Sequence, residues 1–246
     1  MGILVQREFV VDRDDRREFE RQSRLGVWPG QLYHGSLMIA YGTWAFGGPG
    51  DCVITNSVYR SFDHWTATRA WGEFNTNPER VAETKHLREI RGGRPRLINH
   101  SRARIIEYVD EVSEPQARWR ELGEPTLEPP PTFGQQSVVS ELTYDLAEGA
   151  QARFLELSRE QIWPWLAEQG GRMLIYGRDP LGSANSVITL FAFRSIEAWH
   201  HLSRPAAEQQ PPAEVIEAWE ERHRLVEGQH GRILMVQTEF GTPVEP

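Results

Sequence analysis

The chain contains little cysteine, little lysine and no long apolar segment. Cys52 is its one cysteine in 246 residues, which excludes an internal disulfide. The longest apolar run, residues 187–193, is interrupted by a threonine and is far shorter than the roughly 20 residues that cross a bilayer. Residues 1–15 become charged before they could form the apolar core of a secretion signal. We therefore expect a cytoplasmic protein without a membrane span.

Charge is unevenly divided along the chain. The formal net charge is −8, but residues 1–122 hold 18 basic and 17 acidic residues, whereas residues 123–246 hold 9 and 18. An acidic protein with a balanced first half matches a polyanion poorly, so nucleic acid is not an expected partner. The local basic run 85–104 has two interpretations. It is a solvated helix end and loop, or it contacts an anion such as a substrate carboxylate, because arginine forks fit planar oxyanions.

An internal repeat is the strongest pattern in the sequence. Residues 34–42 align without a gap on residues 169–177, and both segments end in Tyr-Gly, at Tyr41 and Tyr176. Residues 53–55 match 187–189, residues 59–65 match 193–199, and the Trp-Pro pair at 28–29 matches the pair at 163–164. Separate blocks that keep one register predict two copies of a single unit.

Each copy is expected to follow the order β-α-β-β-α-β. Apolar and β-branched stretches predict first strands over 3–11 and 138–146, and helices are expected over 14–25 and 147–169. A hairpin follows in each copy, and Ser61 and Ser195 have the position of helix N-caps. Further helices, over 78–91 and 212–227, lead to final strands over 104–112 and 232–240. Residues 113–136 contain five prolines and are expected to link a first module, 1–112, to a second, 137–246.

This arrangement resembles the NIPSNAP branch of the dimeric α+β barrel superfamily. The resemblance rests on an aromatic-Arg-Ser triplet followed by a tryptophan in each copy, at 59–61 with Trp65 and at 193–195 with Trp199, and on a glutamate in each first strand, Glu8 and Glu141. It implies an α+β fold in which two ferredoxin-like modules pack sheet to sheet around a central cavity. Because one chain carries both modules, we expect an intramolecular version of the dimeric barrel. A further homodimer stays open.

The candidate site residues are those expected to face that cavity. Thr55, Ser57 and Tyr59 share one strand face and would form a polar wall, while Phe191 belongs to a matching apolar one. The opposite strand face, residues 54, 56 and 58, is an alternative almost as well supported. Further candidate ligand contacts are Trp44 in the loop after the second strand, where it would cover the cavity, and Glu141, Tyr176 and His200.

Acid–base chemistry is the expected activity. His34, Glu8 and Tyr41 are the candidate catalytic residues, since histidine titrates near neutrality and the repeat would pair Glu8 with Glu141. The histidine has a surface position as its structural alternative, and the two glutamates have a solvent-facing strand position. No metal-binding, phosphate-binding or dinucleotide-binding motif is present, so no metal site is expected.

The resemblance implies an enzyme that transforms a small hydrophobic molecule, aromatic or polyketide-like, as a cofactor-independent monooxygenase, cyclase or isomerase. Two alternatives stay open. One is a non-catalytic small-molecule-binding or interaction protein, and the other is a haem-binding enzyme of the same superfamily, which would need an axial histidine.

Overall fold

The computed structural model describes residues 1–113, 136–203 and 211–237. Within these residues, eight antiparallel strands close into a barrel in the order β1-β3-β2-β8-β5-β7-β6-β4. The strands are β1 (Gly2–Val10), β2 (Leu37–Phe46), β3 (Cys52–Tyr59), β4 (His100–Tyr108), β5 (Val138–Leu146), β6 (Arg172–Arg178), β7 (Ser186–Phe193) and β8 (Val226–Val236). The protein therefore has an α+β fold built on a closed antiparallel barrel.

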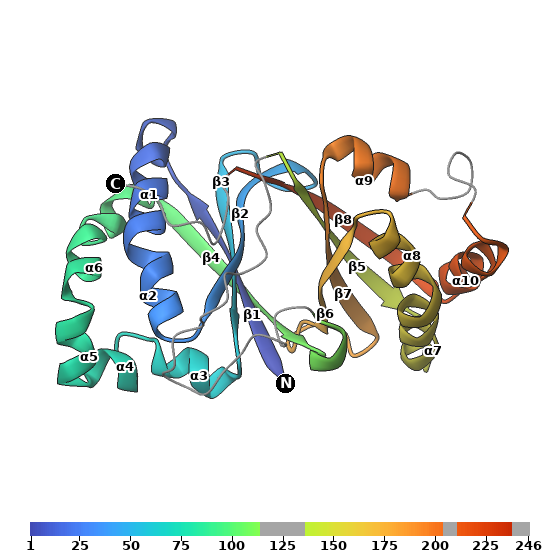
Figure 1. Ribbon diagram of the computed structural model, residues 1–246, viewed down its shortest axis with the longest axis horizontal. Coiled ribbons are helices and arrows are strands. Elements are labelled where there is room, and N and C mark those ends of the chain that lie inside the picture. The colour runs from blue at the N-terminus through green and yellow to red at the C-terminus, as the bar shows by residue number, and fades with distance from the viewer. Residues whose placement is uncertain (114–135, 204–210, 238–246) are drawn as a thin grey trace.

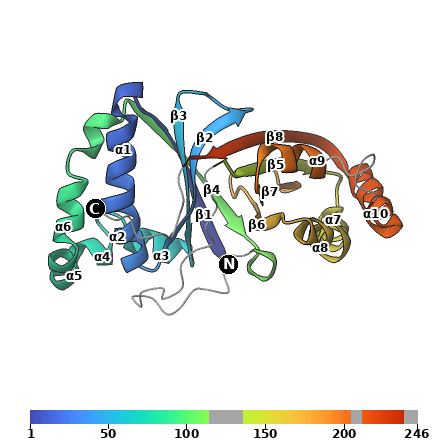
Figure 2. The ribbon, with the colours of Figure 1, turned by 45° about the horizontal axis from the view of Figure 1, so that its top comes forward.

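Helices cover the outside of the barrel on two opposite flanks (Figures 1 and 2). The first flank carries α1 (Arg16–Gln22), α2 (Trp28–Tyr33), α3 (Phe62–Ala67), α4 (Glu73–Thr76), α5 (Pro78–Glu83) and α6 (Lys85–Ile90). The second carries α7 (Gln151–Leu157), α8 (Trp163–Glu168), α9 (Ile196–Leu202) and α10 (Ala213–Arg224). In the described part of the chain, no helix is both long and apolar enough to cross a membrane.

The barrel closes where the edges of two four-stranded sheets meet. β2 pairs with β8, and β4 pairs with β6 through Glu107 with Arg178 and Tyr108 with Gly177. These contacts comprise four residue pairs between β2 and β8 and two between β4 and β6. The two sheets are therefore joined edge to edge as well as across the interior.

The same local features recur in the two halves. A π-helical turn, Ser23–Val27 or Ser158–Ile162, joins two α-helices in each half, and the hydroxyl of its first serine donates to the carbonyl four residues earlier, at 2.8 Å and 2.6 Å. A proline without an N–H follows at the second position of α2 and of α8, so one helical hydrogen bond is missing there and the preceding turn widens. Trp28 with Tyr41 and Trp163 with Tyr176 form ring pairs at the same centroid distance, 5.5 Å.

Most predicted elements are present, with shifted ends. Ser61 and Ser195 cap α3 and α9 by accepting from the third residue along. The helix expected over 78–91 is two helices, α5 and α6, separated at Thr84, and β4 begins at His100 rather than at 104. β8 ends at Val236. The expected linker 113–136 lies outside the described residues except for its two ends.

Candidate functional site

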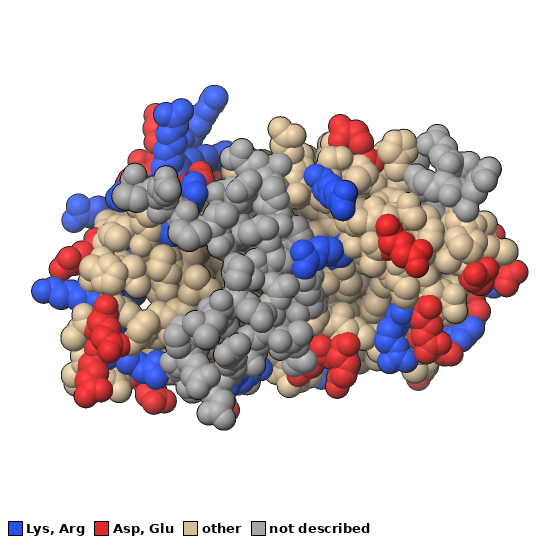
Figure 3. Space-filling view, viewed as in Figure 1, with Lys and Arg blue, Asp and Glu red and all other residues tan. Residues whose placement is uncertain are grey.

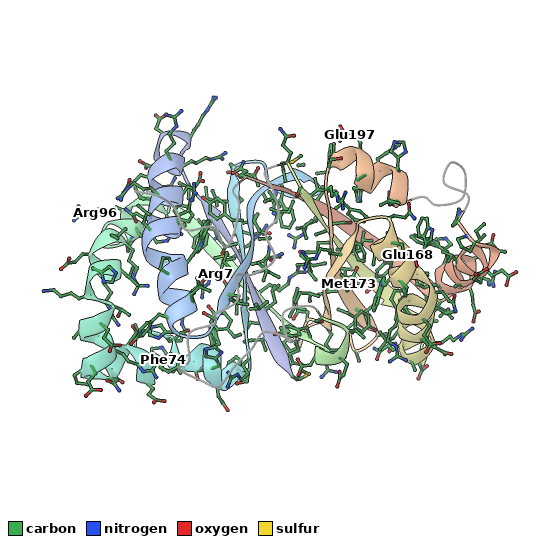
Figure 4. All side chains as sticks on the ribbon, viewed as in Figure 1. Arg7, Phe74, Arg96, Glu168, Met173 and Glu197 are labelled. Atoms are coloured by element: carbon green, nitrogen blue, oxygen red, sulfur yellow. The ribbon has the colours of Figure 1, made fainter. Side chains whose placement is uncertain are left out.

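A pocket of about 570 Å³ lies between the first half's sheet and its helices, outside the barrel. Its floor is formed by strand residues whose side chains face the helices: Arg7, Phe9, Met38, Thr55, Ser57 and Tyr59. Its walls come from the π-helical turn, α2, α6 and the segments around them. Figure 4 places Arg7 between α2 and the strands. A volume of this size suits a small organic ligand.

His34 is held at the edge of this pocket by the end of α2. Gly35 adopts a positive φ of 74°, its N–H donates to the Leu32 carbonyl, and the Ser36 N–H donates back to the Gln31 carbonyl. This is the Schellman arrangement, which needs a residue tolerant of positive φ directly after the helix cap. The sequence therefore fixes the backbone of His34 through the glycine that follows it.

The His34 ring is buried among aromatic and cationic groups. It is 8% exposed, stacks on the ring of Phe74 at 4.7 Å and 12°, and its Nδ1 has no hydrogen-bond partner in the described part of the chain. Burial, followed by the charges of Arg80, Arg88 and Arg91, lowers the pKa of His34 to about 4. The imidazole is therefore neutral at pH 7, with a lone pair available to accept a proton.

His64 positions His34 through a backbone contact. The Nε2 of His64 lies 2.6 Å from the His34 carbonyl oxygen, and its Nδ1 accepts from the Arg60 N–H at 3.1 Å. A ring that accepts at Nδ1 and faces a carbonyl at Nε2 is neutral, with its proton on Nε2. Burial lowers the pKa of His64, which favours the same form.

Gln31 and Ser57 form a hydrogen-bonded polar pair in the pocket that Arg7 also lines. Gln31 Nε2 donates to Ser57 Oγ at 3.1 Å, while its Oε1 has no partner among the described residues. Burial raises the pKa of the Tyr59 hydroxyl, so this phenol stays protonated. The floor therefore offers hydrogen-bond donors and acceptors to a ligand.

The barrel interior holds an ionic network, not the aromatic cavity expected from sequence. Arg232 contacts Glu8 at 2.7 Å and Glu141 at 2.6 Å, Arg102 pairs with Glu8, and Arg104 reaches Glu141 at 2.5 Å. Both carboxylates are buried, which overturns the solvent-facing alternative. A hollow of about 290 Å³ opens beside this network. Burial alone would raise the pKa of Glu141, but the neighbouring arginines lower it overall, so this carboxylate stays ionised within its ion pairs.

The expected repeat pairing of Glu8 with Glu141 is wrong by two residues. In the strand register, Gln6 lies opposite Asn56 and Arg104. Glu141 lies opposite Leu190 and Arg232, which are the equivalent positions of the second half. Glu8 pairs with Ile54, and the strand position that faces the matching Ile188 is Thr143. The first strands therefore match Gln6 with Glu141, and Glu8 with Thr143.

The three candidate catalytic residues do not converge. His34 borders the pocket, whereas Glu8 points into the barrel. Tyr41 is 1% exposed and packs edge-on against Trp28 without lining the pocket, and burial raises the pKa of its hydroxyl. Of this set, the structure leaves His34 as the residue placed to meet a ligand.

Some of the candidate ligand contacts line the pocket and others lie elsewhere in the fold. Thr55, Ser57 and Tyr59 line the pocket, on the strand face that turns towards the helices. Trp44 belongs to β2 rather than to a loop, and its Nε1 donates to Glu8 Oε1 at 3.2 Å inside the barrel. In the second half, Tyr176 and Phe191 are buried in an apolar cluster, and His200 is exposed on α9.

Sequence reasoning missed the arginines of the pocket as a set. Arg7, Arg69, Arg88, Arg91 and Arg94 all line it. The basic run 85–104 had indicated three of them through its alternative of an anion contact. Arg7 carried no signal, because an alternating strand pattern does not tell which buried face meets a helix. Among the described residues, no cluster of three or more histidine, cysteine or acidic side chains could hold a metal ion.

Solved structures with a similar fold are found for the whole chain. No family model matches the chain, and no curated protein matches it. A putative monooxygenase from Lactobacillus acidophilus NCFM is similar at 12% identity and a TM-score of 0.60, with 98% of this chain and 96% of that chain covered. An anthrone oxidase-like protein is similar at 15% identity and a TM-score of 0.50, covering 99% and 95%.

NIPSNAP family proteins are also among the similar structures, but they span part of the chain. One from Agrobacterium tumefaciens is 23% identical with a TM-score of 0.35, covering 40% of this chain and 90% of that chain. The fold is thus an α+β fold with a closed antiparallel barrel, similar to the folds of a putative monooxygenase and of an anthrone oxidase-like protein. At these identities the likeness concerns the fold alone.

Proposed function

We propose that the chain is a small-molecule-transforming enzyme of the α+β barrel type, acting on an aromatic or polyketide-like molecule in the pocket of its first half. The single observation that carries this proposal is the neutral, buried His34 at a pocket of about 570 Å³. The reaction class is that of a cofactor-independent monooxygenase, cyclase or isomerase. The similar fold of an anthrone oxidase-like protein supports this class.

In this proposal His34 removes a proton from the substrate. An acidic C–H or O–H bond breaks, its proton moves to an imidazole nitrogen, and its electron pair stays on the substrate as a carbanion or oxyanion. The forming anion is stabilised by the arginines of the pocket, and in turn raises the pKa of His34 by opposing their charge. Ring closure, a double-bond shift or attack on dioxygen would each consume the anion.

The proposed architecture is a duplication with one retained site. Residues 1–112 and 137–246 would be two ferredoxin-like modules, supported by the shared π-helical turns, caps and ring pairs. Register places Arg7 opposite Thr55 in the first half and Leu142 opposite Thr189 in the second, and it matches Ser57 with Phe191. Arg7 and Ser57 of the pocket thus stand where the other half has the apolar side chains of Leu142 and Phe191.

The test is turnover of anthrone by the full chain under air. We expect oxygen uptake and an anthraquinone-type absorption spectrum with wild type and with His200→Asn, an exposed control, and a loss of at least 100-fold with His34→Asn. Equal rates for all three proteins would reject His34 as the base. A spectrum from 300 to 700 nm belongs to the same experiment, because a Soret band would replace the cofactor-free class with the haem alternative.

A non-catalytic binding protein is the second candidate. It is favoured by the separation of Glu8 and Tyr41 from His34, which leaves one candidate acid–base group at the pocket. Tight, saturable binding of anthrone without turnover would support this candidate.

A further inference from the structure

The arginines of the pocket have no protein carboxylate among them. Five arginines line it, and none of the described lining residues is aspartate or glutamate. The arginines in the barrel do have acidic partners: Arg102, Arg104 and Arg232 each form an ion pair with Glu8 or Glu141. On the space-filling face in Figure 3, acidic and basic side chains are interspersed over both halves. Among the described residues, the pocket arginines therefore lack the acidic neighbours that the barrel arginines have.

The five arginines differ in what their side chains contact, and Arg69 lies over the ring of Trp65, with its guanidinium carbon 5.0 Å from the ring centroid. Arg88 donates to Asn75 at 2.5 Å and Arg94 donates to the Phe19 carbonyl at 3.0 Å. For Arg7 and Arg91, the described part of the chain contains no hydrogen bond or ion pair to the side chain. Burial first, and then a neighbouring arginine, lowers the pKa of each, through Arg69 for Arg7 and through Arg88 for Arg91. Like charges held together out of water are unfavourable unless an anion joins them.

The second half lacks this arrangement at matching positions. The residue at the strand position of Arg7 is Leu142, and Phe191 and Phe193 stand where the first half has Ser57 and Tyr59. Phe191 and Phe193 pack against each other at 5.1 Å within the apolar cluster. The barrel scaffold therefore does not require an arginine on the floor.

The remaining lining favours a flat hydrocarbon body. Phe9, Val27, Trp28, Leu87 and Ile98 contribute apolar surface to the pocket. Aromatic and aliphatic walls with a few fixed charges are typical of sites that orient a ring system by one polar group.

We propose that the pocket binds a planar aromatic anion, with its charged group held by Arg7 on the floor, and that the positive charge of Arg91 on the wall favours the same anion. The charged group is a carboxylate or a phenolate, both of which fit the flat donor fork of a guanidinium. This inference rests on the proposed function and deepens it, because it names the substrate class of the same pocket.

The test is calorimetric binding of two matched pairs of probes to the full chain at pH 8.5. One pair is 2-naphthoate and neutral 2-naphthamide, and the other is 4-nitrophenolate and neutral 4-nitroanisole. We expect at least one anion to bind 10-fold or more tightly than its neutral partner. Arg7→Leu, which places the residue of the second half at this position, should remove that preference and leave the binding of the neutral probe unchanged.

Arg178→Leu is the matched control, since Arg178 is exposed and pairs with Glu107 at 3.3 Å away from the pocket. It should keep the preference. Arg91→Gln provides a second pocket variant in case Arg7→Leu fails to fold, as judged by circular dichroism. Equal binding of anion and neutral probe by wild type, a preference that survives both pocket variants, or no binding of any probe would each overturn the inference.

Two results distinguish a failure of the anion-binding inference from a failure of the proposed enzyme function. His34→Asn should keep the preference for the anion while losing turnover. Charge-selective binding without any turnover would sink the enzyme proposal and leave the anion site standing.

Discussion

Gln6 and Glu141 meet across the barrel, where Gln6 Nε2 donates to Glu141 Oε2 at 2.6 Å. Their strand partners Arg104 and Arg232 each contact both of them, with distances of 2.5 to 3.0 Å to Gln6 Oε1 and Glu141 Oε1. The two residues occupy matching positions in the two halves, but one is neutral and the other charged. Glu141 thus lies between two guanidiniums at the interface between the halves, and Arg232 links it to Glu8 in the same network.

Glu141→Gln should destabilise the protein. The substitution leaves Arg104 partly buried without its carboxylate and leaves Arg232 with Glu8 alone. Breaking a buried ion pair on one side costs about 3–5 kcal/mol, less where the partners reach water. We expect a loss of about 2 kcal/mol or more in the free energy of unfolding, measured with urea at pH 7. Glu107→Gln, which removes an exposed pair with Arg178, should cost no more than about 1 kcal/mol. Equal losses for the two variants would contradict the role of Glu141.

The elements were predictable from sequence because their signals are local. The serine caps, the glycine after α2 and the Trp-Pro pairs act within a few residues, and all recur in both halves. The broken helix at Thr84 was missed, because its interruption has no proline or glycine to mark it.

The site was less predictable because both faces of the central strands are buried. Every residue of β3 is buried, so alternation in that strand gives no clue to which face meets helices and which faces the barrel. The side chains of Thr55 and Ser57 were therefore found in a pocket, but one on the opposite side of the sheet from the expected cavity. A similar limit applies to Glu8, whose position relative to Glu141 depends on a register that short motifs do not fix.

Ser57→Phe should close the pocket without unfolding the protein. The phenyl ring is accommodated at the matching position, Phe191, and here it would enter the cavity from the floor. We expect no calorimetric binding of 2-naphthoate, with a thermal midpoint within a few degrees of wild type. Ser183→Phe, on an exposed loop, should leave binding unchanged. Retained binding in Ser57→Phe would place the ligand elsewhere.

The protonation of His34 should occur well below its ordinary pKa of 6.5. Because burial and nearby arginines lower that pKa to about 4, the unfolded chain binds the proton first as the pH falls. His34 therefore contributes a loss of stability that begins near pH 6.5 and is complete near pH 4, and none above pH 7. The measurement is the ring carbon-bound proton shift by NMR, assigned with His34→Asn. We expect a midpoint near 4, moving upwards when 2-naphthoate is bound, and a midpoint of 6.5 or higher would be inconsistent with the buried cationic setting.

Tyr41→Phe should leave ligand binding unchanged, whereas Tyr59→Phe should weaken it. The Tyr41 ring packs against Trp28 but the residue does not line the pocket, so removing its hydroxyl leaves the ligand surface unchanged. Tyr59→Phe removes a hydroxyl from the floor itself, beside Gln31 and Ser57. We expect the dissociation constant of 2-naphthoate to stay within 2-fold for Tyr41→Phe and to rise several-fold for Tyr59→Phe, since a lost hydrogen bond costs about 0.5–1.5 kcal/mol. The reverse order would return Tyr41 to the site and move the ligand towards β2.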